Sequence, residues 1–151
     1  LTTDYRKTTV AAQEKKAETG VASAAIELKD GTIISSRSSS LLGPSAALIL
    51  NATKYLAGIP HTMKLIPETL IEPIQKTKVE YLHGRNPRLH TDEVLVALSL
   101  LSNNDENCRK ALAQLPKLKG CQMHSTVMLT DVDQKIFKRL GVGLTCDPVK
   151  K

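Results

Sequence analysis

The chain has 151 residues and a formal net charge of +6, with 21 lysine and arginine residues against 15 aspartate and glutamate residues. Its hydrophobic content of 41% is sufficient, at this length, for one domain with its own core. Aromatic residues make up only 3% of the chain and tryptophan is absent, so the stacking surface of a single-strand nucleic-acid binder is missing. The positive charge therefore favours an anionic small molecule over a nucleic acid as partner.

The cellular compartment is predicted from what the sequence lacks. It has no run of about 18 apolar residues and no signal-peptide pattern, so we expect a cytoplasmic protein without a membrane span. The cysteines Cys108, Cys121 and Cys146 are odd in number and have no C-x-x-C spacing. This pattern argues against a disulfide framework and a cysteine zinc site, and we expect reduced thiols and no bound metal.

The first predicted element is a helix over residues 2–19, which Gly20 ends. Its apolar stripe is thin, which is typical of a helix at the surface or at an interface with another part of a protein. We therefore expect an N-terminal helix at residues 1–20 that packs on a missing portion of a longer chain. Residues 21–151 are expected to form the α/β domain itself.

A hairpin and a buried helix follow. Strands over 22–29 and 32–37 flank the dipeptide Asp30-Gly31, which favours a type I′ turn with positive φ at both residues. Gly43 allows an unusual backbone angle at the bend, and Pro44 suits the first turn of a helix. The helix over 44–57 is apolar nearly all round, which predicts burial against the sheet.

The second half of the chain predicts alternating helices and strands. The expected elements are a strand at 61–66, a helix that begins at Pro73 rather than Pro67, a helical hairpin over 91–115 with Thr91 and Asp105 as caps, a strand at 121–129, a helix that Thr130 caps and Gly141 ends, and a strand at 143–146. The last three form a β-α-β unit, so their strands should be parallel. Together the elements predict a three-layer α/β/α fold on a mixed sheet.

The order of hairpin, bend and buried helix resembles the start of the cytidine-deaminase-like fold. In that family the helix start carries a His or Cys ligand followed by Ala-Glu, and a later P-C-x-x-C completes a zinc site. Here the helix starts with Pro44-Ser45-Ala46-Ala47, and P-C-x-x-C occurs nowhere in the chain. The resemblance therefore implies a cytidine-deaminase-like topology without the metal site and without zinc-dependent deamination.

Longer phrases resemble the C-terminal part of the bacterial domain-of-unknown-function family eighteen-forty-six. They are TTDYRKTTVAAQEKKAETG, SSLLGPSAA, IEPIQKTKVEYL, NPRLHTDEVLVALS and LPKLKGCQMHSTV, and they cover nearly the whole chain. The resemblance implies a cytosolic bacterial protein with an additional N-terminal, nucleotide-binding-like α/β portion, and a homo-oligomer. It identifies no activity, and the cofactor, if any, stays unknown.

Two polar stretches are candidate binding sites. The first precedes the helix at 91 and contains Arg85, Asn86, Arg88 and His90. Two arginines before a helix N-terminus can hold a phosphate or a carboxylate, although Thr91, Asp92 and Glu93 can equally serve only as helix caps. The second stretch, at the mouth of the buried helix, contains Ser39, Ser40, Gly43 and Ser45. Its backbone N–H groups can form an anion nest, and helix capping is the alternative explanation.

These observations leave two hypotheses for function. In the first, the chain is a non-catalytic, deaminase-like subdomain that forms a ligand cleft or an oligomer interface with the missing N-terminal portion. In the second, it contributes to an enzyme site that handles a phosphorylated small molecule or a nucleotide. A lost metal motif beside an arginine-rich loop favours the first, and the sequence by itself does not decide whether the protein is an enzyme.

Overall fold

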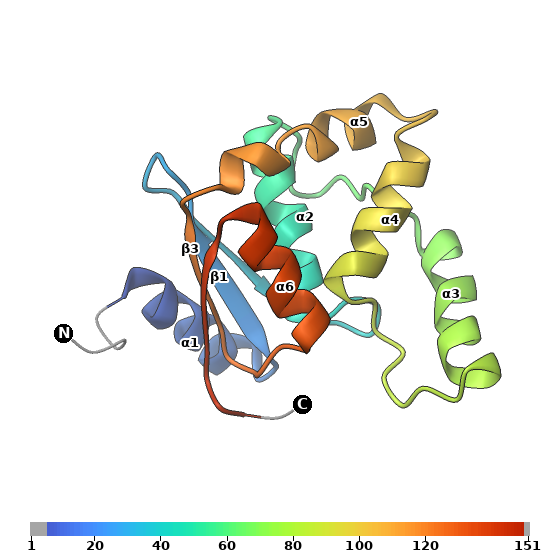
Figure 1. Cartoon of the computed structure of the whole chain (residues 1–151), viewed down its shortest axis with the longest axis horizontal. Coiled ribbons are helices and arrows are strands. Elements are labelled where there is room, and N and C mark those ends of the chain that lie inside the picture. The colour runs from blue at the N-terminus through green and yellow to red at the C-terminus, as the bar shows by residue number, and fades with distance from the viewer. Residues whose placement is uncertain (1–5, 150–151) are drawn as a thin grey trace.

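The computed structural model describes residues 6–149, which fold around one four-stranded sheet (Figure 1). In chain order the elements are α1 (Lys7–Thr19), β1 (Ser23–Glu27), β2 (Ile33–Arg37), α2 (Pro44–Leu56), α3 (Glu68–Lys76), the π-helical turn η2 (Thr77–Tyr81), α4 (Thr91–Leu101), α5 (Glu106–Leu112), the 3₁₀ turn η3 (Leu115–Leu118), β3 (Gln122–Ser125), α6 (Asp131–Leu140) and β4 (Gly143–Cys146). None of the helices within residues 6–149 combines the length and apolar character that crossing a bilayer requires.

The sheet has the strand order β2-β1-β3-β4 and is mixed. Strand β1 runs antiparallel to both β2 and β3, whereas β3 and β4 are parallel. The connection from β3 through α6 to β4 is the β-α-β unit predicted from the sequence. The hairpin, the parallel pair and the mixed sheet are thus confirmed.

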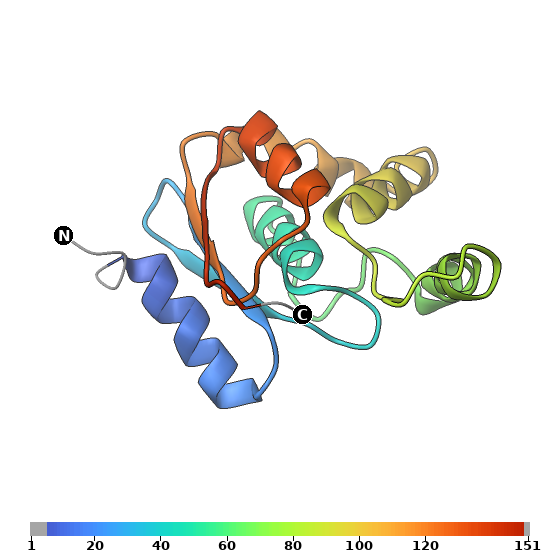
Figure 2. The same cartoon turned by 60° about the horizontal axis from the view of Figure 1, so that its bottom comes forward.

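Helices cover both faces of this sheet. Figure 2 shows α1 alone on one face, where it packs on β1 and β2, while α2 lies on the other face. Helix α6 packs beside β4, and α4 and α5 pack on the outer side of α2. This arrangement confirms the three-layer α/β/α fold, whereas its assignment as cytidine-deaminase-like stays a prediction.

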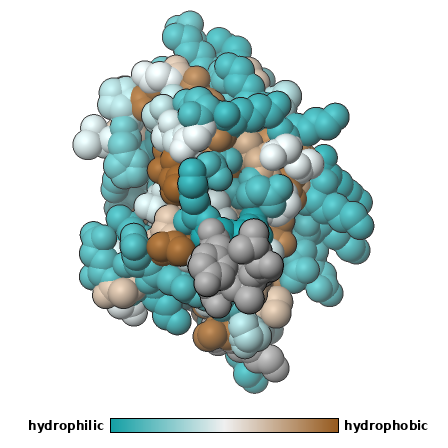
Figure 3. Space-filling model, turned by 90° about the vertical axis from the view of Figure 1, so that its left-hand side faces the viewer, coloured by the Kyte–Doolittle hydropathy of each residue, from teal (hydrophilic) through white to brown (hydrophobic). Residues whose placement is uncertain are grey.

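Helix α1 packs on the sheet with a small face that contains both polar and apolar residues. Its buried residues are Thr8, Thr9 and Ala12, and Gly20 ends it in the left-handed conformation, as predicted. Residues 2–5 of the predicted helix lie outside the described residues. The surface seen in Figure 3 is mostly hydrophilic, with separate hydrophobic side chains. Contact of residues 1–20 with a missing portion of a longer protein remains a prediction.

The core lies between the sheet and α2, α4 and α6. Strand β1 is buried on both faces because α1 covers the side opposite α2, so Ala24, Ala25 and Ile26 are all inaccessible. Helix α2 contributes Leu48 and Ile49, as its apolar sequence predicts. Helix α2 thus packs between the sheet on one side and α4 and α5 on the other. This packing fixes the position of the N-terminus of α2.

The predicted type I′ turn of the hairpin is wrong, and Gly43 does not use its conformational freedom. In the hairpin only Gly31 has a positive φ, +88°, and the N–H of Gly31 donates to the carbonyl of Leu28 at 2.9 Å. This pattern is typical of a type I turn followed by a left-handed glycine, in place of the type I′ turn. Gly43 has a φ of −71°, which any residue can adopt.

The predicted strand at 61–66 is also absent, and the segment consists of turns. The ammonium group of Lys54 donates hydrogen bonds to the carbonyls of His61 at 3.0 Å and Met63 at 3.2 Å. These two bonds hold the segment against the last turns of α2 instead of in an extended pairing with another strand. The segment therefore wraps over the end of α2.

Two element boundaries differ from the prediction. Helix α3 begins at Glu68, after Pro67, and Pro73 lies inside it. The proline removes one N–H donor from the helix, and the solvent-exposed Thr69 carries the carbonyl that this donor would have bonded. Strand β3 ends at Ser125 rather than at residue 129, because the carbonyl of Val127 accepts from the Ser125 hydroxyl in a local turn.

Candidate functional site

Two loops lie side by side at the N-terminus of α2. The loop before α2 and the loop before α4 form a parallel β-bridge between Leu42 and Leu89. The N–H of Leu89 donates to the carbonyl of Leu41 at 2.9 Å, and the N–H of Gly43 donates to the carbonyl of Leu89 at 3.1 Å. The predicted binding residues around 39–45 and 85–90 are therefore neighbours in space.

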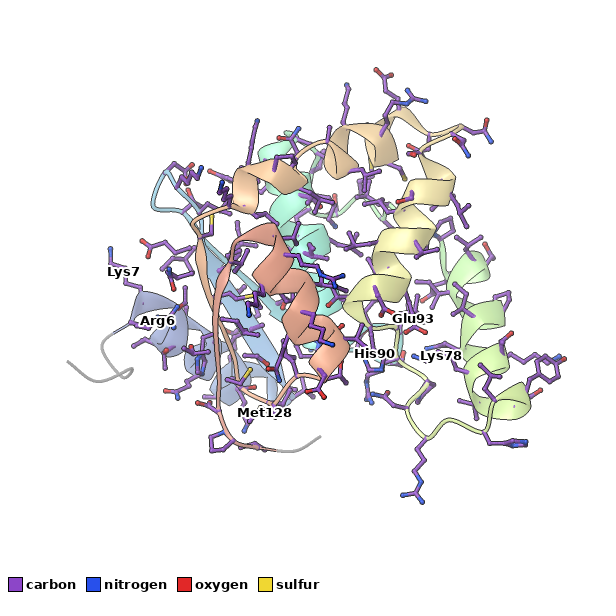
Figure 4. The ribbon with its side chains drawn as sticks, viewed as in Figure 1. Arg6, Lys7, Lys78, His90, Glu93 and Met128 are labelled. Carbon is purple, nitrogen blue, oxygen red and sulfur yellow. The ribbon has the colours of Figure 1, made fainter. Side chains whose placement is uncertain are left out.

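Polar side chains fix the second loop. The side-chain Nε of Arg88 donates to the carbonyl of Ser39 at 2.5 Å. The backbone N–H of Arg88 donates to the side-chain oxygen of Asn86 at 3.0 Å. Lys78 donates to the carbonyl of Arg88 at 2.6 Å and to the carboxylate of Glu93 at 2.8 Å. Figure 4 shows Lys78 from η2 and Glu93 from α4 side by side, with His90 near them. The loop is thus connected to three other segments.

A cavity of about 470 Å³ opens beside this loop, and we call it the arginine pocket. Its lining consists of Val21, Ala22, Ser38, Gly43, Pro44, Arg85, Asn86, Pro87, Arg88 and Val127. The guanidinium group of Arg85 forms no hydrogen bond or ion pair with any of residues 6–149. Its donors are consequently available to an anion in the pocket.

Next to the pocket, a buried carboxylate meets the first turns of three helices. Asp133, at the third position of α6, is 0% exposed. Its Oδ1 accepts from the N–H of Thr91 at 3.2 Å, and its Oδ2 accepts from the hydroxyl of Ser45 at 3.3 Å. The hydroxyl of Thr91 donates to the Ser45 hydroxyl at 3.0 Å. The carboxyl group thus lies where the N-terminal ends of α2, α4 and α6 converge.

The structure divides the predicted binding residues among three places. Arg85, Asn86, Arg88 and Gly43 line the arginine pocket, whereas Ser39 and Ser40 line a different cavity. Ser45 is buried against Asp133, and the Nδ1 of His90 lies 3.9 Å from the same carboxylate. At the start of α2, where the anion nest is expected, the Gly43 N–H donates to the carbonyl of Leu89, and the carboxyl group of Asp133 lies beside it, bonded to Ser45.

The capping prediction for α4 needs one correction. His90 is the N-cap residue and Thr91 is the first residue of the helix. The carboxylate of Glu93 accepts from the N–H of His90 at 2.8 Å, so Glu93 serves the helix start as the sequence alternative suggests. The sequence does not single out Asp133 as a site residue, because there it is only an acidic residue three positions after Thr130.

The described part of the chain offers few groups for metal or thiol chemistry. Within residues 6–149 no three His, Cys, Asp or Glu side chains gather in a way that could hold a metal ion. The cysteines are free, and burial raises the pKa of the Cys108 thiol to about 11. Burial also raises the pKa of Cys121 and of Cys146. At neutral pH all three are protonated thiols, which are poor nucleophiles.

A second polar cluster joins the end of the sheet to α1. The Nδ1 of His124 lies 2.7 Å from the hydroxyl of Thr145, and its Nε2 lies 3.0 Å from the carboxylate of Asp147. Arg6 donates to the same Thr145 hydroxyl at 2.8 Å. The imidazole is buried between β3 and β4. These contacts tie the last strand to its neighbour and to the start of α1.

Comparison with known proteins assigns this chain to a family. Residues 4–151 match the model described as "Domain of unknown function DUF1846, C-terminal". A UPF0371 protein from Corynebacterium aurimucosum is 51% identical over 144 residues, which cover 95% of this chain and 29% of the relative. A UPF0371 protein from Streptococcus thermophilus is 42% identical over 148 residues, which cover 98% of this chain and 30% of the relative. The chain therefore belongs to the DUF1846 family and represents the C-terminal domain of its longer members.

Proposed function

We propose that this domain is a non-catalytic binding module, which forms one wall of a ligand cleft together with the N-terminal portion of the longer family protein. The observation that carries this proposal is the arginine pocket, in which Arg88 is fixed and Arg85 keeps its donors available. A guanidinium group presents a planar set of donors that matches a phosphate or carboxylate. The ligand we expect is an anionic small molecule.

The chemistry of the pocket lining favours binding over catalysis. Besides the two arginines, the polar side chains in the lining are the amide of Asn86 and the hydroxyl of Ser38. None of these groups exchanges a proton readily near neutral pH, which general acid–base catalysis requires. Val21, Pro44 and Val127 provide apolar walls. An enzyme site for a phosphorylated small molecule or nucleotide, the alternative, would need its catalytic groups from the N-terminal portion.

A thermal-shift panel on the full-length protein tests the binding role. We expect inorganic phosphate, nucleotides or sugar phosphates to raise the melting temperature, since a ligand at 100 times its Kd adds about 2.7 kcal/mol. The double variant Arg85→Ala/Arg88→Ala should lose most of this shift, because both guanidinium groups line the pocket. Arg139→Ala, an exposed arginine on α6, is the matched control and should keep the full shift.

Three outcomes are informative. A shift that survives the double variant would contradict binding in the arginine pocket. A full panel without any shift would contradict the whole binding role. A ligand that binds and is also converted by the full-length protein would favour the enzymatic alternative.

The outer face of α4 supports a contact with the N-terminal portion. Val96 is 60% exposed and Leu100 is 67% exposed, although the sequence of α4 is apolar nearly all round. Tyr81 and Leu82, at the end of η2, are also exposed. Apolar side chains one helical turn apart that are exposed in an isolated domain are typical of a surface that another part of the protein covers. Relatives about three times as long as this chain supply a portion that can cover it.

The double variant Val96→Glu/Leu100→Glu tests this contact in the full-length protein. If the N-terminal portion covers α4, two buried charges should lower the melting temperature and split a single calorimetric transition into two. Val132→Glu adds a charge at an exposed apolar position of a different helix, α6, and should behave like the wild type. A double variant that melts like Val132→Glu would show that the α4 face is not covered.

A further inference from the structure

A second cavity, of about 350 Å³, lies beside α2, between the loop at 39–42 and the segment that leads into α3. We call it the lysine cavity. Most of its lining is aliphatic, including Leu41, Leu50, Leu65, Ile66 and Ile71. It shares no lining residue with the arginine pocket, so it is independent of the function proposed above. Its volume is at the small end of the range for ligand pockets.

The buried cation of this cavity is Lys54. The residue is only 8% exposed, and it forms no ion pair with any carboxylate in residues 6–149. Its ammonium group donates to the carbonyls of His61 and Met63. An ammonium group has three N–H donors, so one donor remains without an acceptor in the described part of the chain.

Burial without a carboxylate is unfavourable for the charged form of this lysine. Desolvation accordingly lowers the pKa of Lys54 from its ordinary value. An anion within hydrogen-bond distance would oppose that effect and would occupy the remaining donor. Lys64 at the exposed rim adds a second positive charge, against one acidic lining residue, Glu68. The cavity therefore has an excess of positive charge above an aliphatic floor.

From this combination we infer that the lysine cavity binds a small monocarboxylate with an apolar chain. The carboxylate accepts from the Lys54 ammonium, and the chain lies on the leucine and isoleucine side chains. A single remaining donor matches a singly charged head group, and the aliphatic floor disfavours a compact dianion such as phosphate. Lys54 and Asn51 also line a neighbouring cavity of about 340 Å³ beside β2, so the test must distinguish the two.

Calorimetric titration of the full-length protein with octanoate tests the inference. We expect octanoate to bind, and 1-octanol and inorganic phosphate to bind at least about tenfold more weakly. Lys54→Met should weaken octanoate binding by at least about tenfold, since the charge-assisted hydrogen bond is lost. Ala47→Leu fills the lysine cavity and should have a similar effect, whereas Ser35→Leu fills the neighbouring cavity and should leave binding unchanged.

A second measurement on the wild type avoids any folding defect of the variants. Competitive acetylation, read by peptide mass spectrometry, reports how readily each lysine amine reacts. Octanoate should slow the acetylation of Lys54 several-fold and leave the exposed Lys117 unaffected. Equal affinity for octanoate and 1-octanol, unchanged octanoate binding in Ala47→Leu, or unprotected Lys54 in the presence of octanoate would each overturn the inference.

Discussion

Replacing Asp133 with alanine is expected to lower the free energy of unfolding by about 3 kcal/mol. The substitution leaves two buried hydrogen-bond donors without an acceptor, and each unsatisfied donor costs roughly 1–3 kcal/mol. These donors are the N–H of Thr91 and the hydroxyl of Ser45. The carboxylate also lies at the positive ends of three helices, so its loss weakens the packing of α2, α4 and α6 against one another. Urea unfolding, with the midpoint and slope compared to the wild type, measures this effect.

Two further variants separate the charge from the position. Asp133→Asn keeps one acceptor oxygen and should lose less stability than Asp133→Ala. Asp131→Ala removes an exposed acid from the first turn of the same helix, where the dipole contribution is only about 0.3–1 kcal/mol. If Asp133→Ala were no more destabilised than Asp131→Ala, the buried carboxylate would not be the element that joins the three helix starts.

Replacing Phe137 with alanine should be at least as damaging, with an expected loss of about 3–5 kcal/mol. Phe137 is the one phenylalanine in the sequence, and its side chain is 1% exposed in the core beneath α6. Truncation removes its buried apolar surface and leaves a cavity that the rigid sheet on the other side cannot fill. The free energy of unfolding in urea gives the magnitude, and circular dichroism of the folded baseline shows whether the fold persists.

Val132→Ala is the matched control for this experiment. Val132 lies on the same helix but is 53% exposed, so its truncation should change the free energy of unfolding by less than about 0.5 kcal/mol. A loss below about 1 kcal/mol in Phe137→Ala would contradict the packing of α6 on the sheet.

Much of the fold follows from local signals in the sequence. The side chain of Thr130 caps α6 and Gly141 ends it in the left-handed conformation, while Asp105 caps α5. Strand β4 has the predicted bounds, Gly143–Cys146. The two caps and the glycine stop depend on hydrogen bonds between residues a few positions apart, which capping rules describe well. The parallel pairing of β3 and β4 follows from the β-α-β connection between them.

Two of the wrong predictions have a different cause. The segment at 61–66 has the composition of a short strand, but Lys54, from the preceding helix, takes two of its carbonyls. Helix α3 continues through Pro73 because this part of the helix is exposed to solvent. Water can there bond the backbone carbonyl that the missing proline N–H would have bonded. In these two cases the outcome depends on the surroundings, a lysine side chain from another element or the solvent, which the local sequence window does not show.

By itself the sequence determined the layers of the fold, the buried helix at Pro44 and the polar loop that contains Arg85 and Arg88, because periodicity, caps and charge are local properties. Only the tertiary structure decided which of the polar residues meet. The bridge between Leu42 and Leu89 brings two loops together across 46 intervening residues, and Asp133 reaches Ser45 from the far end of the chain. Hydrogen bonds and cavities of this kind depend on how helices pack on a sheet, and that packing is set by the whole core rather than by any one stretch of residues.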